Sequence, residues 1–230
     1  MADSRQKNAS IASHYPLSAI RLLYTFALHA NNNSLMKICF VASEVAPLSK
    51  TGGLADVSGA LPRHLRAIGH DVRVFTPLHA GIDQSKLQIA AVPEATNVPL
   101  TLGSLEYRFS LKVATLPNSS APIYLIDCPA VYDRATIYTN GSDEHLRFLV
   151  LQRAALESCQ RLKFAPDILH CNDWHTALMP LLLKTVYAWD KLFAHTRSLL
   201  SIHNIGYQGQ FSSTTLGHMD LAEHMTKLDA

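Results

Sequence analysis

Residues 37–77, KICFVASEVAPLSKTGGLADVSGALPRHLRAIGHDVRVFTP, contain the pattern that decides the fold. The first residues are almost all apolar, which is typical of a parallel strand buried on both faces of a sheet. Apolar residues then recur every three or four positions, which predicts an amphipathic helix: Leu54, Val57, Leu61, Leu65 and Ile68. DVRVFTP, at the end of the stretch, is typical of a second strand. This strand, helix, strand order predicts a doubly wound, mostly parallel α/β sheet.

Two residues affect the predicted helix. Pro62 removes one of its backbone hydrogen bonds, and Gly69 is suited to end it as a left-handed cap. Beyond it, residues 87–127 contain short alternating runs broken by Pro, Asn and Gly, which predicts hairpins. The alternation of helix and strand then continues. We expect a helix at 143–163, a strand at 166–173, a helix at 174–189 and a strand at 197–204.

The composition excludes several classes of function. The chain has 230 residues, of which 48% are hydrophobic and 17% are charged, and its formal charge is +2. Such a small, scattered charge does not predict a nucleic-acid or membrane surface. The four cysteines lie in or beside apolar runs without a CxxC pair, which predicts buried thiols and a cytoplasmic location. His170, Cys171, His175 and His203 do not have zinc-site spacing, so we expect no metal.

Residues 1–35 differ in character from the rest of the chain. Arg21 interrupts their apolar stretch, which is too short to cross a bilayer and does not match an export signal. Met36 directly precedes the first predicted strand. We therefore expect 1–35 to be a poorly ordered leader or a mis-assigned start, and 36–230 to form one α/β domain.

The loop after the first strand is a candidate anion site. It is not a Walker A loop, because Ser49 precedes Lys50, and it lacks the GxGxxG of a dinucleotide site. What remains is Lys50, followed by the adjacent Gly52 and Gly53 at the start of a helix. Free backbone amides, the helix dipole and a lysine favour an anion there. A glycine turn with a solvated lysine is the alternative.

The whole opening stretch resembles that of bacterial glycogen synthases and plant starch synthases, with their Lys-x-Gly-Gly-Leu loop in the same place. Four further motifs follow in the family's order: IYLIDCPAVYDR (123–134), SDEHLRFLVLQRAALE (142–157), PDILHCNDWHTAL (166–178) and SIHNIGYQGQF (201–211). The resemblance implies the Rossmann-like N-terminal domain of a GT-B fold, whose C-terminal domain is absent from this sequence. It implies retaining transfer of glucose from ADP-glucose to glycogen or a maltooligosaccharide, with no metal or cofactor.

The resemblance also assigns roles to individual residues. Lys50, Gly52 and Gly53 would meet the diphosphate and glucose of the donor, and Asp56 would lie nearby. His175 would be the catalytic residue that holds the transferred glucose and stabilises an oxocarbenium-like transition state. Without the resemblance, a histidine at the start of a helix is more often a cap or a packing residue.

Four other residues are candidate sugar contacts. Asp143 matches a carboxylate that binds sugar hydroxyls, although it also suits the dipole of its helix. Tyr132, beside Asp133 and Arg134, is either a sugar-stacking platform or part of a surface turn with a local ion pair. His203 and Asn204 follow a strand and either bind sugar hydroxyls or are buried hydrogen-bonding groups.

Other functions stay open at this point. The chain is either half of a glycogen synthase, a non-catalytic glucan-binding or subunit-interaction fragment, or part of another sugar-nucleotide enzyme. The match fades after Phe211, so the domain itself is expected to be incomplete at its C-terminal end. Because one wall of a cleft orients a donor poorly, we expect negligible turnover by this chain alone.

Overall fold

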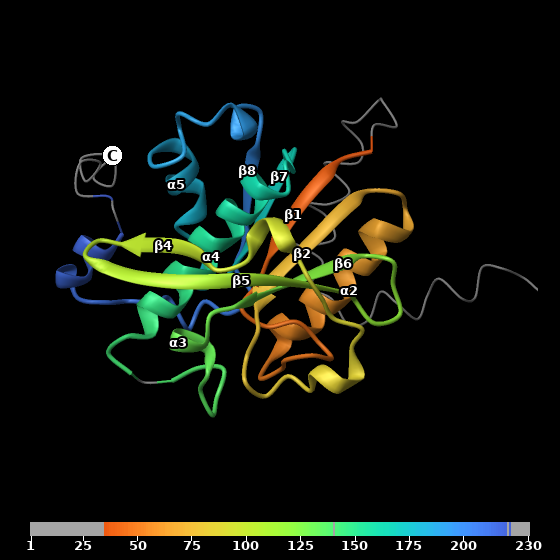
Figure 1. Ribbon diagram of the computed structural model, residues 1–230, viewed down its shortest axis with the longest axis horizontal. Helices are drawn as coiled ribbons and strands as arrows, with labels where there is room; N and C mark the ends of the chain where they lie inside the picture. Colours follow the sequence, from red (N-terminus) through yellow and green to blue (C-terminus); the bar gives the residue numbers. More distant parts are fainter. Residues whose placement is uncertain (1–34, 140, 220, 222–230) are drawn as a thin grey trace, which may run out of the picture. The chain divides into compact units, whose positions relative to one another are not determined.

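One mixed sheet of eight strands organises the computed structural model, which describes residues 35–139, 141–219 and 221 (Figure 1). Its strands are β1 (Lys37–Val41), β2 (Asp71–Pro77), β3 (Ala90–Ala91), β4 (Val98–Leu102), β5 (Leu105–Thr115), β6 (Pro122–Asp127), β7 (Ile168–Asn172) and β8 (Arg197–Ser201). The order is β3-β5-β6-β2-β1-β7-β8, with β4 paired to β5. The leader predicted for 1–35 lies outside the described residues apart from Leu35.

The parallel part of the sheet runs from β6 through β2, β1 and β7 to β8. Strand β5 pairs antiparallel with β3, β4 and β6. The hairpins predicted for 87–127 are therefore confirmed, and β6 joins them to the parallel strands.

Helices cover both faces of the sheet. They are α2 (Gly53–Ala67), α3 (Pro129–Tyr132), α4 (Glu144–Arg161) and α5 (Met179–Lys184), with short 3₁₀ turns at 84–86, 93–95, 174–176, 191–193 and 213–218. Ile38 and Phe40 of β1 lie in the core cluster that contains Leu65 of α2, whereas Cys39 and Val41 lie in the cluster that contains much of α4. Both faces of β1 are therefore covered, which explains why its residues are apolar from Ile38 onward. The doubly wound α/β prediction is confirmed.

Two predicted elements are shorter than expected. The helix predicted for 174–189 is a 3₁₀ turn followed by α5, which has Pro180 in its first turn and ends at Lys184, before Thr185 with φ −126° and ψ −89°. Proline lacks a backbone N–H and is favoured in the first turn of a helix, where that group has no helical partner, so α5 begins beside Pro180. In α2 the helix continues through Pro62, at the cost of one backbone hydrogen bond.

The strand predicted for 197–204 ends at Ser201. The amides of His203 and Asn204 donate to the Asp173 carboxylate instead of continuing the ladder, at 2.6 and 3.3 Å. A side chain from the neighbouring strand end therefore terminates β8. Gly69 is a left-handed cap, as predicted, with φ 105°.

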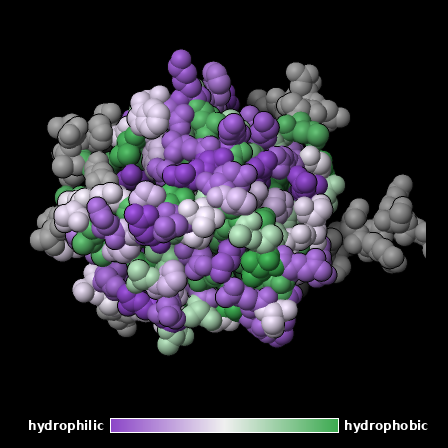
Figure 2. Space-filling view, viewed as in Figure 1, coloured by the Kyte–Doolittle hydropathy of each residue, from purple (hydrophilic) through white to green (hydrophobic). Residues whose placement is uncertain are grey.

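Among the described residues, no helix is long and apolar enough to cross a bilayer. The face seen in Figure 2 is mostly hydrophilic, with apolar residues in small separate groups. The four cysteines are buried and unbridged, as their apolar surroundings predict.

Candidate functional site

The candidate site lies at the carboxyl ends of neighbouring parallel strands, where ligands bind in open α/β sheets. The loop that follows β1 contains the glycine pair, the turn that follows β7 contains His175, and residues 202–211 follow β8. Strands β1 and β7 are direct neighbours, and so are β7 and β8. The topology thus brings to one edge of the sheet segments that are far apart in sequence.

A buried carboxylate anchors the glycine loop. Glu44 is 2% exposed and accepts hydrogen bonds from the Thr51 amide at 2.5 Å and the Thr51 hydroxyl at 2.8 Å. Gly52 then precedes α2 in an extended conformation, and no side chain caps the helix. The first turn of α2 therefore has backbone N–H groups that no capping side chain satisfies.

The packing of the chain does not require glycine at positions 52 and 53. A Cβ on Gly53 would meet no atom within 4 Å, and one on Gly52 would lie 3.8 Å from a Glu44 carboxylate oxygen. Neither residue has a positive φ. Their missing side chains therefore leave the N-terminus of α2 open to a ligand.

Gly59, within the same helix α2, is needed for packing. A Cβ there would lie 2.4 Å from the Ala46 carbonyl oxygen, which cannot move independently of the backbone. We expect Gly59→Ala to lower the free energy of unfolding by about 1–3 kcal/mol. Gly53→Ala should change it by less than about 0.5 kcal/mol. Urea unfolding of both variants checks this, and equal losses would contradict it.

Lys50 and Asp56 form an exposed ion pair. The Lys50 ammonium lies 2.6 and 2.8 Å from the two Asp56 carboxylate oxygens, and the side chains are 52% and 56% exposed. Such pairs contribute little to stability because water screens them. Lys50 can therefore exchange this partner for an anionic ligand at small cost.

His175 lies in an aromatic cage. Its ring stacks on Tyr138 at 4.9 Å between centroids, contacts Trp174 at 4.2 Å, and meets Phe148 edge-on at 4.5 Å. The residue is 6% exposed, and Nδ1 is buried without a hydrogen-bond partner among the described residues. Burial, followed by the charge of Arg147, lowers the pKa of His175 to about 3. The imidazole is therefore neutral at pH 7.

The turn before His175 has an unusual backbone. Asp173 has φ 55° and ψ −174°, a conformation that non-glycine residues rarely adopt. Its carboxylate accepts the amides of His203 and Asn204, and the neighbouring Asn172 side chain hydrogen-bonds the His203 ring at 2.9 Å. These bonds join the β7 turn to the segment after β8.

His203 and Asn204 therefore lie at the predicted edge of the site, but each already has an intramolecular partner. The Asn204 side-chain oxygen accepts from the Gly206 amide at 3.0 Å. Burial lowers the pKa of His203, with the Asp173 carboxylate opposing the shift. Sugar binding by these two residues stays a prediction.

The prediction that Tyr132 is a sugar-stacking platform is wrong. Tyr132 is 1% exposed, and its hydroxyl donates to the Arg147 carbonyl at 2.9 Å. The alternative, a local ion pair within the turn, is also wrong, because Arg134 pairs with Asp143 at 2.5 Å. Because Val131 and Tyr132 of α3 are both buried in the hydrophobic core, the ring has no surface to offer a sugar.

Asp143 lies at the N-terminus of α4, as the sequence indicated, but its carboxylate makes no capping hydrogen bond. The charged residue that sequence reasoning missed is its neighbour Glu144. That carboxylate accepts from the Thr139 amide and hydroxyl and pairs with the wholly buried Arg147 at 2.8 Å. A Glu and an Arg three positions apart beside apolar helix positions were the available signal.

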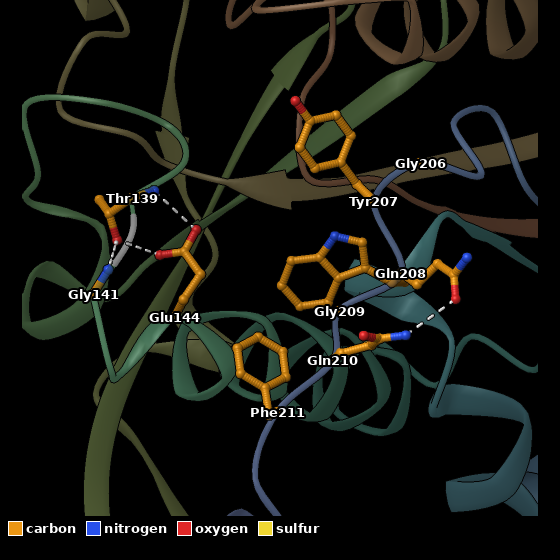
Figure 3. A pocket seen from close by; sticks show the side chains of 10 residues that line it. Thr139, Gly141, Glu144, Gly206, Tyr207, Gln208, Gly209, Gln210 and Phe211 are labelled. Atoms are coloured by element: carbon orange, nitrogen blue, oxygen red, sulfur yellow. Dashed lines mark hydrogen bonds between the residues drawn. The ribbon is translucent and has the colours of Figure 1, made fainter.

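A pocket of about 490 Å³ adjoins Trp174 and the segment after β8 (Figure 3). Figure 3 shows Thr139 and Glu144 on one side, with Tyr207, Gln208 and Gln210 on the other. Aromatic rings, amides and a carboxylate are groups that can pack on sugar faces and bond sugar hydroxyls. In the described part of the chain, no group of three or more His, Cys, Asp or Glu side chains could hold a metal ion.

Gly209 permits the close approach that forms one wall of this pocket. It has φ 62°, and a Cβ would lie 2.3 Å from the indole of Trp174. A glycine is therefore needed for both the backbone conformation and the contact. Trp174 in turn contacts His175, so the side chain of Trp174 lies between this segment and the candidate catalytic residue.

Comparisons with known proteins agree with this geometry. The family model described as starch synthase catalytic domain matches residues 37–230. Glycogen synthase of Aeromonas hydrophila is 46% identical over 184 residues, which are 76% of this chain and 36% of that protein. Glycogen synthase 1 of Geobacter metallireducens is 37% identical over 198 residues, 84% of this chain and 39% of that protein.

A solved structure is also similar. The catalytic domain of Starch Synthase IV from Arabidopsis thaliana, bound to ADP and acarbose, superposes with a TM-score of 0.76 at 29% identity. The match covers 86% of this chain and 39% of that one. The chain thus spans less than half the length of each of these proteins. It belongs to the family defined by the starch synthase catalytic domain.

Proposed function

We propose that this chain forms the acceptor-side wall of a glycogen synthase. The enzyme transfers glucose from ADP-glucose to the non-reducing end of an α-1,4-glucan with retention of configuration. The observation that carries the proposal is the pairing of an open helix N-terminus after β1 with a caged, neutral histidine after the adjacent β7. Family membership supports it, and so does the similarity to a starch synthase bound to ADP and acarbose.

The donor's diphosphate binds at the glycine loop. Lys50 leaves Asp56 and pairs with phosphate, and the free amides at the start of α2 donate to phosphate oxygens. Gly52 and Gly53 allow the backbone to approach, since no side chain stands in front of it. Asp56 stays nearby as the partner to which Lys50 returns.

His175 hydrogen-bonds the glucose that is transferred. A neutral imidazole can orient a hydroxyl without repelling the positive charge that develops at the anomeric carbon, whereas an imidazolium would oppose it. The acceptor hydroxyl attacks on the face from which the phosphate departs, and that phosphate takes the acceptor's proton. Asp143 is the carboxylate that binds glucosyl or acceptor hydroxyls, after exchange with Arg134.

The glucan acceptor occupies the pocket beside Trp174. Tyr207 is 73% exposed and offers an aromatic face, and Gln208 and Gln210 offer amides. His203 and Asn204 directly precede this segment in the chain, and we assign them as further contacts to sugar hydroxyls. The remaining wall of the cleft belongs to a second GT-B domain, which supplies most donor contacts. The buried thiols suit a cytoplasmic location.

Calorimetric titration of the chain with ADP, ADP-glucose, UDP-glucose and maltoheptaose tests the proposal. We expect weak binding of ADP and ADP-glucose, and at least a tenfold loss in Gly53→Val. Gly81→Val is the matched control, because a Cβ there also meets nothing within 4 Å. Maltoheptaose binding without any nucleotide binding would favour a non-catalytic glucan-binding fragment instead. In a radiolabelled transfer assay the chain alone should show negligible turnover.

Gly209→Ala tests the acceptor half of the proposal. The added methyl should push the 206–211 segment off Trp174 and weaken maltoheptaose binding at least tenfold, while ADP binding persists. Gly103→Ala is the control, since it introduces a similar strain at φ 60° with a 2.3 Å contact to the Gly217 carbonyl. Equal loss of glucan binding in both variants would mean that general destabilisation is the cause.

A further inference from the structure

Aromatic contacts, and not hydrogen bonds, fix the ring of His175. Nδ1 is buried without a partner, and no hydrogen bond among the described residues involves this imidazole. Three rings surround it, from Tyr138, Phe148 and Trp174. Of these, only Tyr138 lies nearly parallel to the imidazole, at an interplanar angle of 22°, and it therefore covers a full face. The orientation of His175 depends on where these rings are held.

Tyr138 is itself fixed by its hydroxyl. That group hydrogen-bonds the Ser43 hydroxyl at 2.8 Å, and Ser43 is completely buried two residues after β1. The next residue, Glu44, accepts both the amide and the hydroxyl of Thr51 in the glycine loop. Ser43 and Glu44 thus form a two-residue segment that contacts the stacking partner of His175 and anchors the glycine loop.

The loop that contains Tyr138 is also held from the other side. Thr139 donates its amide and hydroxyl to Glu144, which pairs with the wholly buried Arg147 of α4. Tyr138 therefore has little freedom to leave its position over His175. A phenylalanine would fill the same space, but a buried tyrosine hydroxyl needs a partner, and here the partner belongs to the segment behind the glycine loop.

We infer that Tyr138 is a positioning residue: it stacks on His175 and, through Ser43, couples the imidazole to the glycine loop. It does not touch the reacting atoms. Its hydroxyl holds the His175 imidazole and the glycine loop in a fixed relative position, so that a displacement of either one moves the other. This coupling gains its catalytic meaning from the proposed function, but it is measurable in the chain without any ligand.

NMR of the ligand-free chain labelled in histidine side chains and backbone amides tests the inference. Loss of a signal in His175→Gln assigns the imidazole. Tyr138→Leu removes the stack, and Tyr138→Phe removes only the hydroxyl. Tyr187→Phe is the matched control, because its hydroxyl also bonds side chains, those of Arg153 and Glu157, in the core beside α4.

In Tyr138→Leu at pH 7 we expect the His175 ring signals to shift and broaden, because the ring that covers one face of the imidazole is gone. In Tyr138→Phe the ring should stay caged while the amide signals of Thr51, Gly52 and Gly53 move. Tyr187→Phe should leave both sets unchanged.

Two outcomes would overturn the inference. One is a folded Tyr138→Leu chain with an unaltered His175 ring, and the other is a Tyr138→Phe chain with unaltered glycine-loop amides. If Tyr138→Leu does not fold, the conservative Tyr138→Phe comparison still decides whether the hydroxyl couples the two segments. Because no ligand is used, failure here is distinct from failure of the ADP and maltoheptaose titrations that test the proposed function.

Discussion

Between pH 7 and pH 5 the chain is expected to lose about 5 kcal/mol of its free energy of unfolding, because three of its buried histidines have a pKa of about 4 or below. Burial lowers the pKa of His79 and of His170 to about 4, and that of His175 to about 3. Neighbouring positive charge adds to burial, from Arg147 for His79 and His175, and from His203 for His170. In His79 a hydrogen bond with the Ser43 carbonyl opposes the shift.

The sign follows from proton uptake. In the unfolded chain these histidines have a pKa of about 6.5, so they bind protons below that pH. In the folded chain they bind protons only at about pH 4 or below. The stabilisation is therefore complete above pH 6.5 and is lost as the pH falls towards 4. Each such histidine contributes at most about 1.4 kcal/mol per pH unit to the slope of the free energy of unfolding against pH.

Urea unfolding at pH 7, 6 and 5 measures this loss. Because small domains are stable by only about 5–15 kcal/mol, the midpoint should move far towards lower urea. Replacing His170 by Gln should reduce the slope by about a third, whereas replacing the exposed His195 by Gln should leave it unchanged. A free energy of unfolding that is flat from pH 7 to 5 would show that these imidazoles titrate normally.

Glu144→Ala is expected to cost about 3–5 kcal/mol of stability, because it leaves the guanidinium of Arg147 buried without its counter-charge. Arg147 is 0% exposed, and one of its terminal nitrogens already has no hydrogen-bond partner among the described residues. The same substitution releases Thr139, which donates twice to Glu144. The loop that holds Tyr138 should therefore loosen as well.

Two further variants separate burial from charge. Asp56→Asn breaks the exposed pair with Lys50 and should cost less than about 1 kcal/mol. Glu144→Leu combined with Arg147→Met removes both buried charges and should recover much of the loss. Thermal and urea unfolding report on all three. A double variant as unstable as Glu144→Ala would mean that the hydrogen bonds to Thr139 and Val131, and not the unpaired charge, dominate.

Local patterns in the sequence were sufficient for most of the fold. Strand β1, helix α2 and strand β2 form within 41 consecutive residues. The spacing of their apolar side chains indicates whether each segment is a helix or a strand and which face is buried. Lys50, Gly52 and Gly53 at the start of a helix marked a candidate anion site, and the resemblance to the Lys-x-Gly-Gly-Leu loop of starch synthases favoured it over a plain glycine turn. The positions of Lys50 and His175 at the carboxyl ends of strands follow from the same reasoning.

Tertiary structure alone decided the environment of each side chain. The sequence could not show that Tyr132 points into the core, or that Asp173 ends β8 by accepting the amides of His203 and Asn204. Nor could it pair Tyr138 with Ser43, 95 positions apart. Periodicity is a property of neighbouring residues, whereas burial, pKa and hydrogen-bond partners depend on segments that meet only after the chain has folded.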